Sequence, residues 1–229
     1  MKTFKLYMIR HGITQGNLEG KYIGSTDLPL CEQGREEIET LVDTCEYPHV
    51  QKVYCSPLKR AVETADIIYP DTFLQKVDAL KEYDFGVFEN QSLEQLKEDA
   101  AFQEWMEGDM DTAPPQGESK EQFQKRLEFG INQIFMDMMQ NDITSAALIT
   151  HGGVIAALLA AYGLPQRGEL EWQTESGKGY TVMTYTQLWM RDQFFEVYDP
   201  IPYSTLEDGF SSIQEYSFWD VEEQNEEIE

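Results

Sequence analysis

The chain has 229 residues, of which 41% are hydrophobic and 12% aromatic, enough for one sizeable domain with a buried core. Its formal net charge of −25 excludes a general binder of nucleic acid or of an anionic membrane, because such proteins need a basic surface. A small phosphorylated substrate remains possible, since a few arginines at one site can override a remote negative field.

The first apolar run, residues 4–9, predicts a buried strand, and Arg10, His11 and a glycine follow it directly. A second apolar run, residues 146–150, is followed in the same way by His151 and two glycines. In open α/β sheets, ligands bind outside the carboxyl ends of the strands. The two histidines are therefore expected to face one crevice, and the arginine beside the first indicates an anionic ligand.

The remaining pattern alternates between strands and helices. We expect, in chain order, a helix over 32–42, a strand over 52–55, a helix over 58–69, a strand-like stretch over 77–90 broken by Gly86, a helix from a capping box at Ser119 through Met139, a helix over 154–162, and strands over 180–186 and 187–198. This order predicts an α/β fold, a three-layer α/β/α sandwich with a mainly parallel sheet. We expect one domain over residues 1–200, with a small cap inserted at about 90–117.

The end of the chain is strongly acidic: after Arg191 there is no Lys or Arg, and twelve Asp or Glu follow. Residues 201–229 are therefore expected to form an acidic extension with a solvated tail. Three cysteines without metal-ligand spacing predict reduced thiols, and the N-terminal apolar run is too short for a signal peptide or a membrane span. We expect a cytoplasmic protein with no membrane partner; the sequence does not specify an oligomeric state.

Six sequence blocks come in an order that is very specific. They are Arg10 to Asn17, which reads Arg-His-Gly-Ile-Thr-Gln-Gly-Asn; Gly24 with 27–30 and Gly34; Ser56 to Ala65; 80–82 with Gly86 and Glu89; 115–119; and His151 to Gly153. This set, which covers residues 4 to about 165, resembles the histidine phosphatases, also called the phosphoglycerate-mutase-like superfamily. The resemblance implies phosphoryl chemistry without a metal or another cofactor.

By this resemblance His11 is the nucleophile and forms a phosphohistidine. The chemistry agrees, because an imidazole with a pKa of about 6.5 offers a neutral nitrogen lone pair near pH 7. In the family a backbone carbonyl holds the other ring nitrogen. Arg10 and Arg60 would grip the phosphate oxygens, because a guanidinium presents a planar fork of donors, and His151 would donate to them as well.

The resemblance implies Glu82 as the acid that protonates the leaving oxygen and then as the base for the hydrolytic water. The first role requires a carboxyl group with a raised pKa. Asp84 and Glu89 are rivals for this role. We favour Glu82 because it lies four residues before Gly86, as in the family, and we expect Glu89 to be structural.

Three residues of the loop after the first strand are expected to bind substrate. Asn17 is placed to hydrogen-bond a phosphate oxygen, and Thr14 and Gly24 line the same loop. His49 lies in a polar stretch without a motif and is expected to be structural. Four aromatic residues near or in the cap wall the leaving-group pocket or belong to the core: Phe85, Phe88, Phe102 and Trp105.

Two departures from the mutases of this superfamily favour water as the phosphoryl acceptor. In the mutases, a long insertion that begins Gly-Leu-Asn-Lys follows the block that here contains residues 80–82, Gly86 and Glu89. In this chain residues 86–90 run into a short cap instead. The mutases also usually place a hydroxyl residue where this chain has Ile23. We therefore predict a phosphomonoesterase that acts on a small phosphorylated metabolite.

Three alternatives stay open. The first is a phosphoglycerate-type mutase. The second is a zinc hydrolase built on His11 and His151, although the sequence lacks a closely spaced third ligand and Arg10 is a poor neighbour for a cation. The third is a non-catalytic phosphate-binding module, which the presence of all five expected catalytic residues disfavours.

Overall fold

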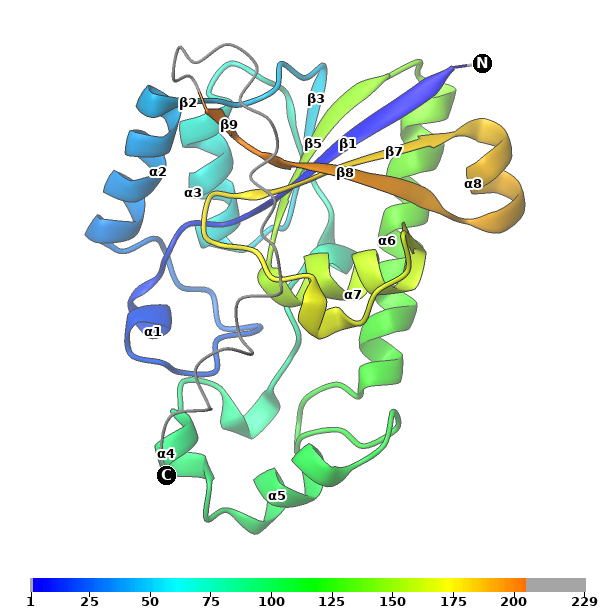
Figure 1. Cartoon of the computed structure of the whole chain (residues 1–229). Helices are drawn as coiled ribbons and strands as arrows, with labels where there is room; N and C mark the ends of the chain where they lie inside the picture. The colour runs from blue at the N-terminus through cyan, green and yellow to red at the C-terminus, as the bar shows by residue number, and fades with distance from the viewer. Residues whose placement is uncertain (1, 205–229) are drawn as a thin grey trace, which may run out of the picture.

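A seven-stranded sheet runs through the centre of the computed structural model, which describes residues 2–204 (Figure 1). Its strands lie in the order β4-β3-β5-β1-β7-β8-β6. They are β1 (Thr3–Arg10), β3 (Lys52–Cys55), β4 (Leu74–Lys76), β5 (Ser145–Thr150), β6 (Gly163–Leu164), β7 (Gly179–Tyr185) and β8 (Phe195–Ile201). Neighbouring strands are parallel except where β7 pairs with β1 and with β8. The mainly parallel sheet is as predicted.

Alternate residues of β1 point to opposite faces of the sheet, as the period of a strand requires. Phe4, Leu6 and Met8 belong to one buried cluster, and Tyr7 and Ile9 belong to another. The first cluster includes residues of α6 (Lys120–Gln140) and α7 (Gly152–Tyr162), and the second includes residues of α2 (Glu32–Thr44) and α3 (Lys59–Ile68). Two helical layers thus cover the sheet, which confirms the predicted three-layer sandwich (Figure 1).

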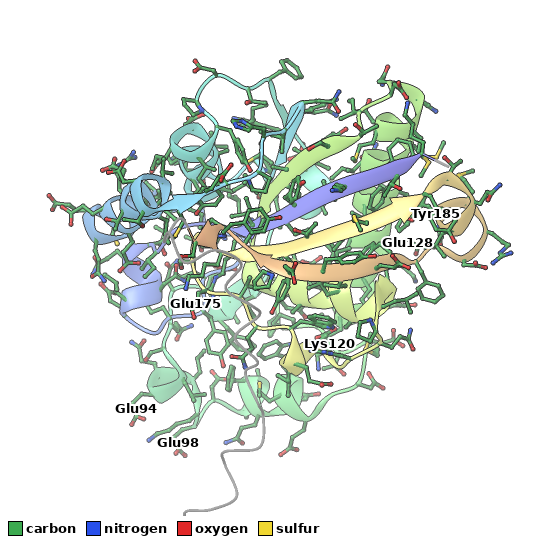
Figure 2. The ribbon with its side chains drawn as sticks, turned by 45° about the horizontal axis from the view of Figure 1, so that its top comes forward. Glu94, Glu98, Lys120, Glu128, Glu175 and Tyr185 are labelled. Carbon is green, nitrogen blue, oxygen red and sulfur yellow. The ribbon has the colours of Figure 1, made fainter. Side chains whose placement is uncertain are left out.

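The shorter elements lie around this sandwich. They are α1 (Gln15–Leu18), β2 (Cys45–Glu46), η1 (Asp78–Leu80), η2 (Gly86–Phe88), α4 (Leu93–Leu96), α5 (Ala100–Glu107), η3 (Glu169–Glu171), α8 (Thr186–Asp192) and β9 (Tyr203–Ser204), which pairs with β2. Helices α4 and α5, in the stretch expected to form the cap, lie at the bottom of Figure 1, away from the sheet. Glu94 and Glu98 stand at the outer edge of this stretch (Figure 2).

The strand-like stretch predicted over residues 77–90 is wrong. No strand lies within it: β4 ends just before it, and the stretch contains the 3₁₀ turns η1 and η2. Three of its carbonyl groups bond to a side chain and not to a neighbouring strand: the Arg126 guanidinium donates to the carbonyls of Ala79, Lys81 and Glu82 at 2.7–3.0 Å. The apolar residues of this stretch pack one by one into the core and do not form a strand.

The strand predicted over residues 187–198 is also wrong in its first half. Residues 186–192 form α8, which ends at Gln193 in the left-handed region with a φ of 54°, and β8 begins at Phe195. The helical turn buries Trp189, whose ring centroid lies 4.4 Å from that of Phe135. Burial of one large ring thus outweighed the extended pattern around it.

Among the described residues, no helix combines the length and apolar character needed to cross a membrane. Residues 205–229, most of the expected acidic extension, lie outside the described residues.

Candidate active site

Three adjacent strands of the sheet end beside one another and deliver the central side chains. His11 follows β1, His151 follows β5, and Arg60 lies in the first turn of α3, after β3. Because β3, β5 and β1 are parallel neighbours, their carboxyl ends share one edge of the sheet. The two imidazole ring centroids are 5.0 Å apart, with their planes at 65°.

The His11 ring is held at both nitrogens. Its Nδ1 lies 2.6 Å from the Gly12 carbonyl oxygen, and its Nε2 lies 3.2 Å from Nε of Arg60. Because a carbonyl and a guanidinium N–H can only accept and donate respectively, Nδ1 carries the hydrogen and Nε2 carries the lone pair. Burial, and then the positive charges of Arg60 and Arg10, lower the pKa of His11 well below its ordinary value of 6.5. The ring is therefore neutral at pH 7.

Arg60 is fully buried, and three of its donors are fixed. Besides His11, it donates through Nη1 to the Thr26 carbonyl at 2.8 Å and through Nη2 to the Gly24 carbonyl at 2.7 Å. Arg10 donates through Nη1 to the Thr174 carbonyl at 2.6 Å. Burial lowers the pKa of both arginines, and the nearby Glu82 carboxylate opposes this.

His151 is oriented by Ser56, which was not predicted as a site residue. Its Nε2 lies 2.7 Å from the hydroxyl of Ser56, which is completely buried at the end of β3. Its Nδ1 is buried without a hydrogen-bond partner among the described residues. Burial and then the neighbouring His11 lower the pKa of His151 well below 6.5. Ser56 belongs to one of the motif blocks, but its partner lies far away in the sequence.

Glu82 lines the same site and is aimed by backbone groups. One carboxyl oxygen accepts from the Tyr83 N–H at 2.9 Å and the other from the Gly153 N–H at 3.1 Å. Burial raises the pKa of Glu82, although these two hydrogen bonds and the charge of Arg60 oppose the rise. A carboxyl group with a raised pKa that lines the same cavity as His11 can serve as a proton donor.

Arg126 holds the segment that carries Glu82, and no motif predicted it. It donates to the backbone carbonyl of Glu82 itself at 2.8 Å, in addition to its bonds with residues 79 and 81. The carboxylate of Glu118 fixes the guanidinium through Nε at 2.8 Å and Nη2 at 2.5 Å. Glu118 belongs to the motif block over residues 115–119, whereas Arg126 lies eight residues further on, in the α6 helix.

Thr14 and Asn17 form the cap of α1. The Thr14 hydroxyl donates to Oδ1 of Asn17 at 2.9 Å, and the Thr14 N–H donates to the same oxygen at 3.0 Å. Asn17 lines the cavity described below, whereas Thr14 is fully buried and does not. The geometry leaves the amide nitrogen of Asn17 as the group that can meet a ligand.

Gly24 lies behind the cavity and supports Arg60. A Cβ at this position would come within 1.7 Å of the Tyr83 carbonyl oxygen, so the close approach requires glycine. Glu89 braces the same loop by accepting from the backbone N–H groups of Gly24, Ser25 and Thr26 at 2.8–3.3 Å. These contacts assign Glu89 a structural part, as expected.

Asp84, the other candidate for the role of proton donor, forms hydrogen bonds within the same loop region. Its Oδ1 accepts from the Gly86 N–H and from the Ser25 hydroxyl, both at 3.0 Å. Of the three acidic candidates, only Glu82 lines the cavity.

A cavity of about 800 Å³ opens from His11 toward the cap, whereas the fully buried Arg60 and His151 do not line it. Arg10, His11 and Glu82 line its polar end. The wider part is lined by apolar and aromatic side chains: Tyr22, Ile23, Phe85, Trp105, Met110, Phe123, Leu170 and Trp172. Of the four aromatic residues considered from the sequence, Phe85 and Trp105 line the cavity, while Phe88 and Phe102 are buried behind it. Lys120, labelled in Figure 2, reaches the cavity from the start of α6.

His49 is exposed and lies outside this cavity. Within the described part of the chain, no group of three or more His, Cys, Asp or Glu side chains is arranged so that it could hold a metal ion.

Comparisons with known proteins agree with this geometry. The sequence profile described as histidine phosphatase superfamily (branch 1) matches residues 6–187. The chain is 29% identical over 178 residues to the adenosylcobalamin/alpha-ribazole phosphatase of Escherichia coli K12, covering 76% of this chain and 86% of that protein. It is 28% identical over 172 residues to a protein of Cronobacter sakazakii named "Probable phosphoglycerate mutase GpmB", covering 72% and 78%.

A solved structure shares the fold. The alpha-ribazole phosphatase of Shigella flexneri superimposes with a TM-score of 0.72 at 24% identity, covering 84% of this chain and 93% of that one. At this identity the likeness concerns the fold alone.

Proposed function

Because the chain belongs to the histidine phosphatase superfamily, branch 1, we propose that it is a metal-independent phosphomonoesterase that acts on a small phosphorylated metabolite through a phosphohistidine at His11. The observation that carries the proposal is the state of that ring. Its Nδ1 is tied to the Gly12 carbonyl, and its Nε2 lone pair meets the Nε donor of Arg60. A neutral, oriented imidazole nitrogen is the nucleophile that such a reaction needs.

In the first step the Nε2 lone pair of His11 attacks phosphorus, and the bond between phosphorus and the ester oxygen breaks. Glu82 gives its proton to that oxygen, so the leaving group departs as an alcohol. Arg10, Arg60 and His151 surround the phosphoryl oxygens and stabilise their charge. In the second step Glu82 takes a proton from water, the water oxygen attacks phosphorus, and His11 leaves as a neutral ring.

A mutase is the second candidate, because one of the relatives carries that name. It would transfer the phosphoryl group back to the substrate instead of to water. Ile23 lines the cavity with an apolar side chain, where a hydroxyl residue is usual in the mutases. This feature supports water as the acceptor.

The relatives' names support a small phosphorylated substrate, and the net charge of −25 supports the absence of nucleic-acid binding. Cys31, Cys45 and Cys55 are not joined in disulfides, which supports the cytoplasm as the location.

The test is phosphate release from a panel of phosphomonoesters in the presence of EDTA. The proteins compared are wild type, His11→Ala and His49→Ala, because His49 is a histidine outside the cavity. We expect release by wild type and His49→Ala and none by His11→Ala. If no ester releases phosphate and a phosphoglycerate is isomerised instead, the mutase replaces the phosphatase. Loss of activity in EDTA would contradict a metal-independent reaction.

A further inference from the structure

Three buried polar atoms at the cavity have no hydrogen-bond partner among the described residues. They are Nε of Arg10, Nε1 of Trp172 and Oγ1 of Thr174, and each of the three residues lines the cavity. Trp172 is only 4% exposed. Because a buried donor without an acceptor is costly, three of them around one cavity indicate groups that pair with a ligand.

The segment that carries two of these atoms is fixed to the site. The Thr174 carbonyl accepts from Arg10 at 2.6 Å, and the Gln173 carbonyl accepts from the Tyr180 hydroxyl at 2.8 Å. Thr174 therefore lies beside the guanidinium that would hold the phosphate. Its unpaired hydroxyl belongs to a residue that lines the same cavity as that guanidinium.

The Trp172 ring is also held in place before any substrate binds. Its face lies 5.0 Å from the Arg167 guanidinium, and it meets the Tyr180 ring edge-to-face with centroids 5.5 Å apart. Two neighbours thus fix the ring orientation, and with it the direction of the N–H group.

A second tryptophan of the same cavity provides the contrast. Nε1 of Trp105 donates to the Tyr83 hydroxyl at 3.4 Å, so its hydrogen-bonding capacity is used within the protein. Trp105 offers the cavity an apolar face, whereas Trp172 also brings an unpaired donor.

We propose that Trp172 and Thr174 determine substrate specificity by hydrogen-bonding to acceptor oxygens of the leaving group, next to the phosphate that Arg10 holds. The ligand class is the phosphate monoester of a sugar or another polyol, in preference to an alkyl phosphate. Trp172 can only donate, so it requires an acceptor oxygen, and the Thr174 hydroxyl can pair with a neighbouring hydroxyl. The inference rests on the proposed phosphatase function.

The experiment compares two esters with five-carbon leaving groups, ribose 5-phosphate and n-pentyl phosphate. The second keeps the primary phosphate ester and lacks the oxygens of the sugar. The kcat/KM ratio for the two esters is measured for wild type, Trp172→Phe, Thr174→Val and the matched control Trp105→Phe. Neither Trp172→Phe nor Thr174→Val removes a hydrogen bond within the described protein.

We expect wild type to prefer ribose 5-phosphate, and Trp172→Phe and Thr174→Val each to lower the preference about tenfold. Trp105→Phe should leave the ratio near that of wild type. An unchanged ratio in both test variants, or an equal change in Trp105→Phe, would overturn the proposal. Thermal melting checks the fold, and Thr174→Val alone decides the question if Trp172→Phe does not fold.

Hydrolysis of the two esters by wild type separates the specificity proposal from the phosphatase function. If wild type hydrolyses both esters with equal kcat/KM, the phosphatase function stands and the specificity proposal is overturned. If wild type releases phosphate from no ester at all, the phosphatase function itself fails and the specificity proposal falls with it.

Discussion

Nε of Arg60 lies 3.2 Å from Nε2 of His11, so a guanidinium donor meets the nitrogen that carries the lone pair. The same arginine is tied to the carbonyls of Gly24 and Thr26. The loop of these two residues is in turn braced by the Glu89 carboxylate. The orientation of the nucleophile therefore depends on a loop and an acidic residue that never touch the ring.

Replacing Arg60 with lysine should lower kcat/KM by about a hundredfold or more, because an ammonium keeps the charge but not the three fixed directions. It should also lower the melting temperature, since the carbonyls of Gly24 and Thr26 lose their donors, and a buried acceptor left unpaired costs about 1–3 kcal/mol. Arg35→Lys is the control, because Arg35 is exposed and makes a single ion pair with Glu63 at 3.2 Å. Wild-type kinetics in Arg60→Lys would contradict the assignment.

Glu82→Gln should reduce hydrolysis of alkyl phosphates far more than that of p-nitrophenyl phosphate, since p-nitrophenolate leaves almost without protonation. The wild-type rate for an alkyl ester should fall as pH rises through the pKa of Glu82, which burial raises. This alkaline decline should vanish in the variant. Steady-state kinetics of both esters across pH measure the effect. Equal losses for the two esters would indicate that Glu82 only positions the substrate.

Arg126→Lys should cause a smaller version of the activity loss expected for Glu82→Gln. The reason is that the carbonyl of Glu82 and those of residues 79 and 81 lose their donors. We expect about a tenfold loss for alkyl phosphates and a smaller loss for p-nitrophenyl phosphate. Lys125→Ala, which changes the exposed neighbour on the same helix, is the control. A uniform loss for both esters would assign Arg126 to stability alone.

Stability should fall as the solution becomes acidic. Burial lowers the pKa of His11 and His151 well below 6.5, so the unfolded chain takes up protons at a higher pH than the folded chain does. The stabilisation is therefore complete above about pH 6.5 and is lost as pH falls below it, by up to about 1.4 kcal/mol per pH unit for each ring.

Urea unfolding between about pH 7 and pH 5 measures this slope. His11→Ala should show a shallower slope than wild type, because one buried neutral ring is gone. Arg35→Lys, a change at an exposed residue that leaves both rings in place, should keep the wild-type slope. The same slope in wild type and in His11→Ala would contradict the predicted dependence of stability on the protonation of His11.

The sequence predicted the central features because they depend on local rules. Short apolar runs that end in Arg-His-Gly and His-Gly-Gly indicated two strand ends, and the parallel neighbours β1 and β5 bring those ends together. Thr14 and Gly24 were expected to bind substrate. In the structure Thr14 caps α1, and the carbonyl of Gly24 accepts a hydrogen bond from Arg60. Motif spacing places residues near a site without saying which of them face the cavity.

The remaining site residues depend on contacts that no local pattern carries. Ser56 meets His151, Arg126 holds the Glu82 segment, and Trp172 lines the cavity from a stretch after the last motif. Each pairing joins elements distant in sequence and is fixed only when the sheet and helices pack. The helical turn at 186–192 was missed for the same reason, since it serves the burial of Trp189 against Phe135.

The central claim is that phosphoryl transfer passes through His11. The most direct test is to mix wild type with a phosphomonoester that it hydrolyses and to stop the reaction in alkali, where phosphohistidine survives. Peptide mass spectrometry then locates the phosphoryl group. The account predicts one added phosphoryl group on the peptide that contains His11, and none in His11→Ala. Phosphate release without a modified His11 peptide, or a phosphoryl group on another residue, would contradict it.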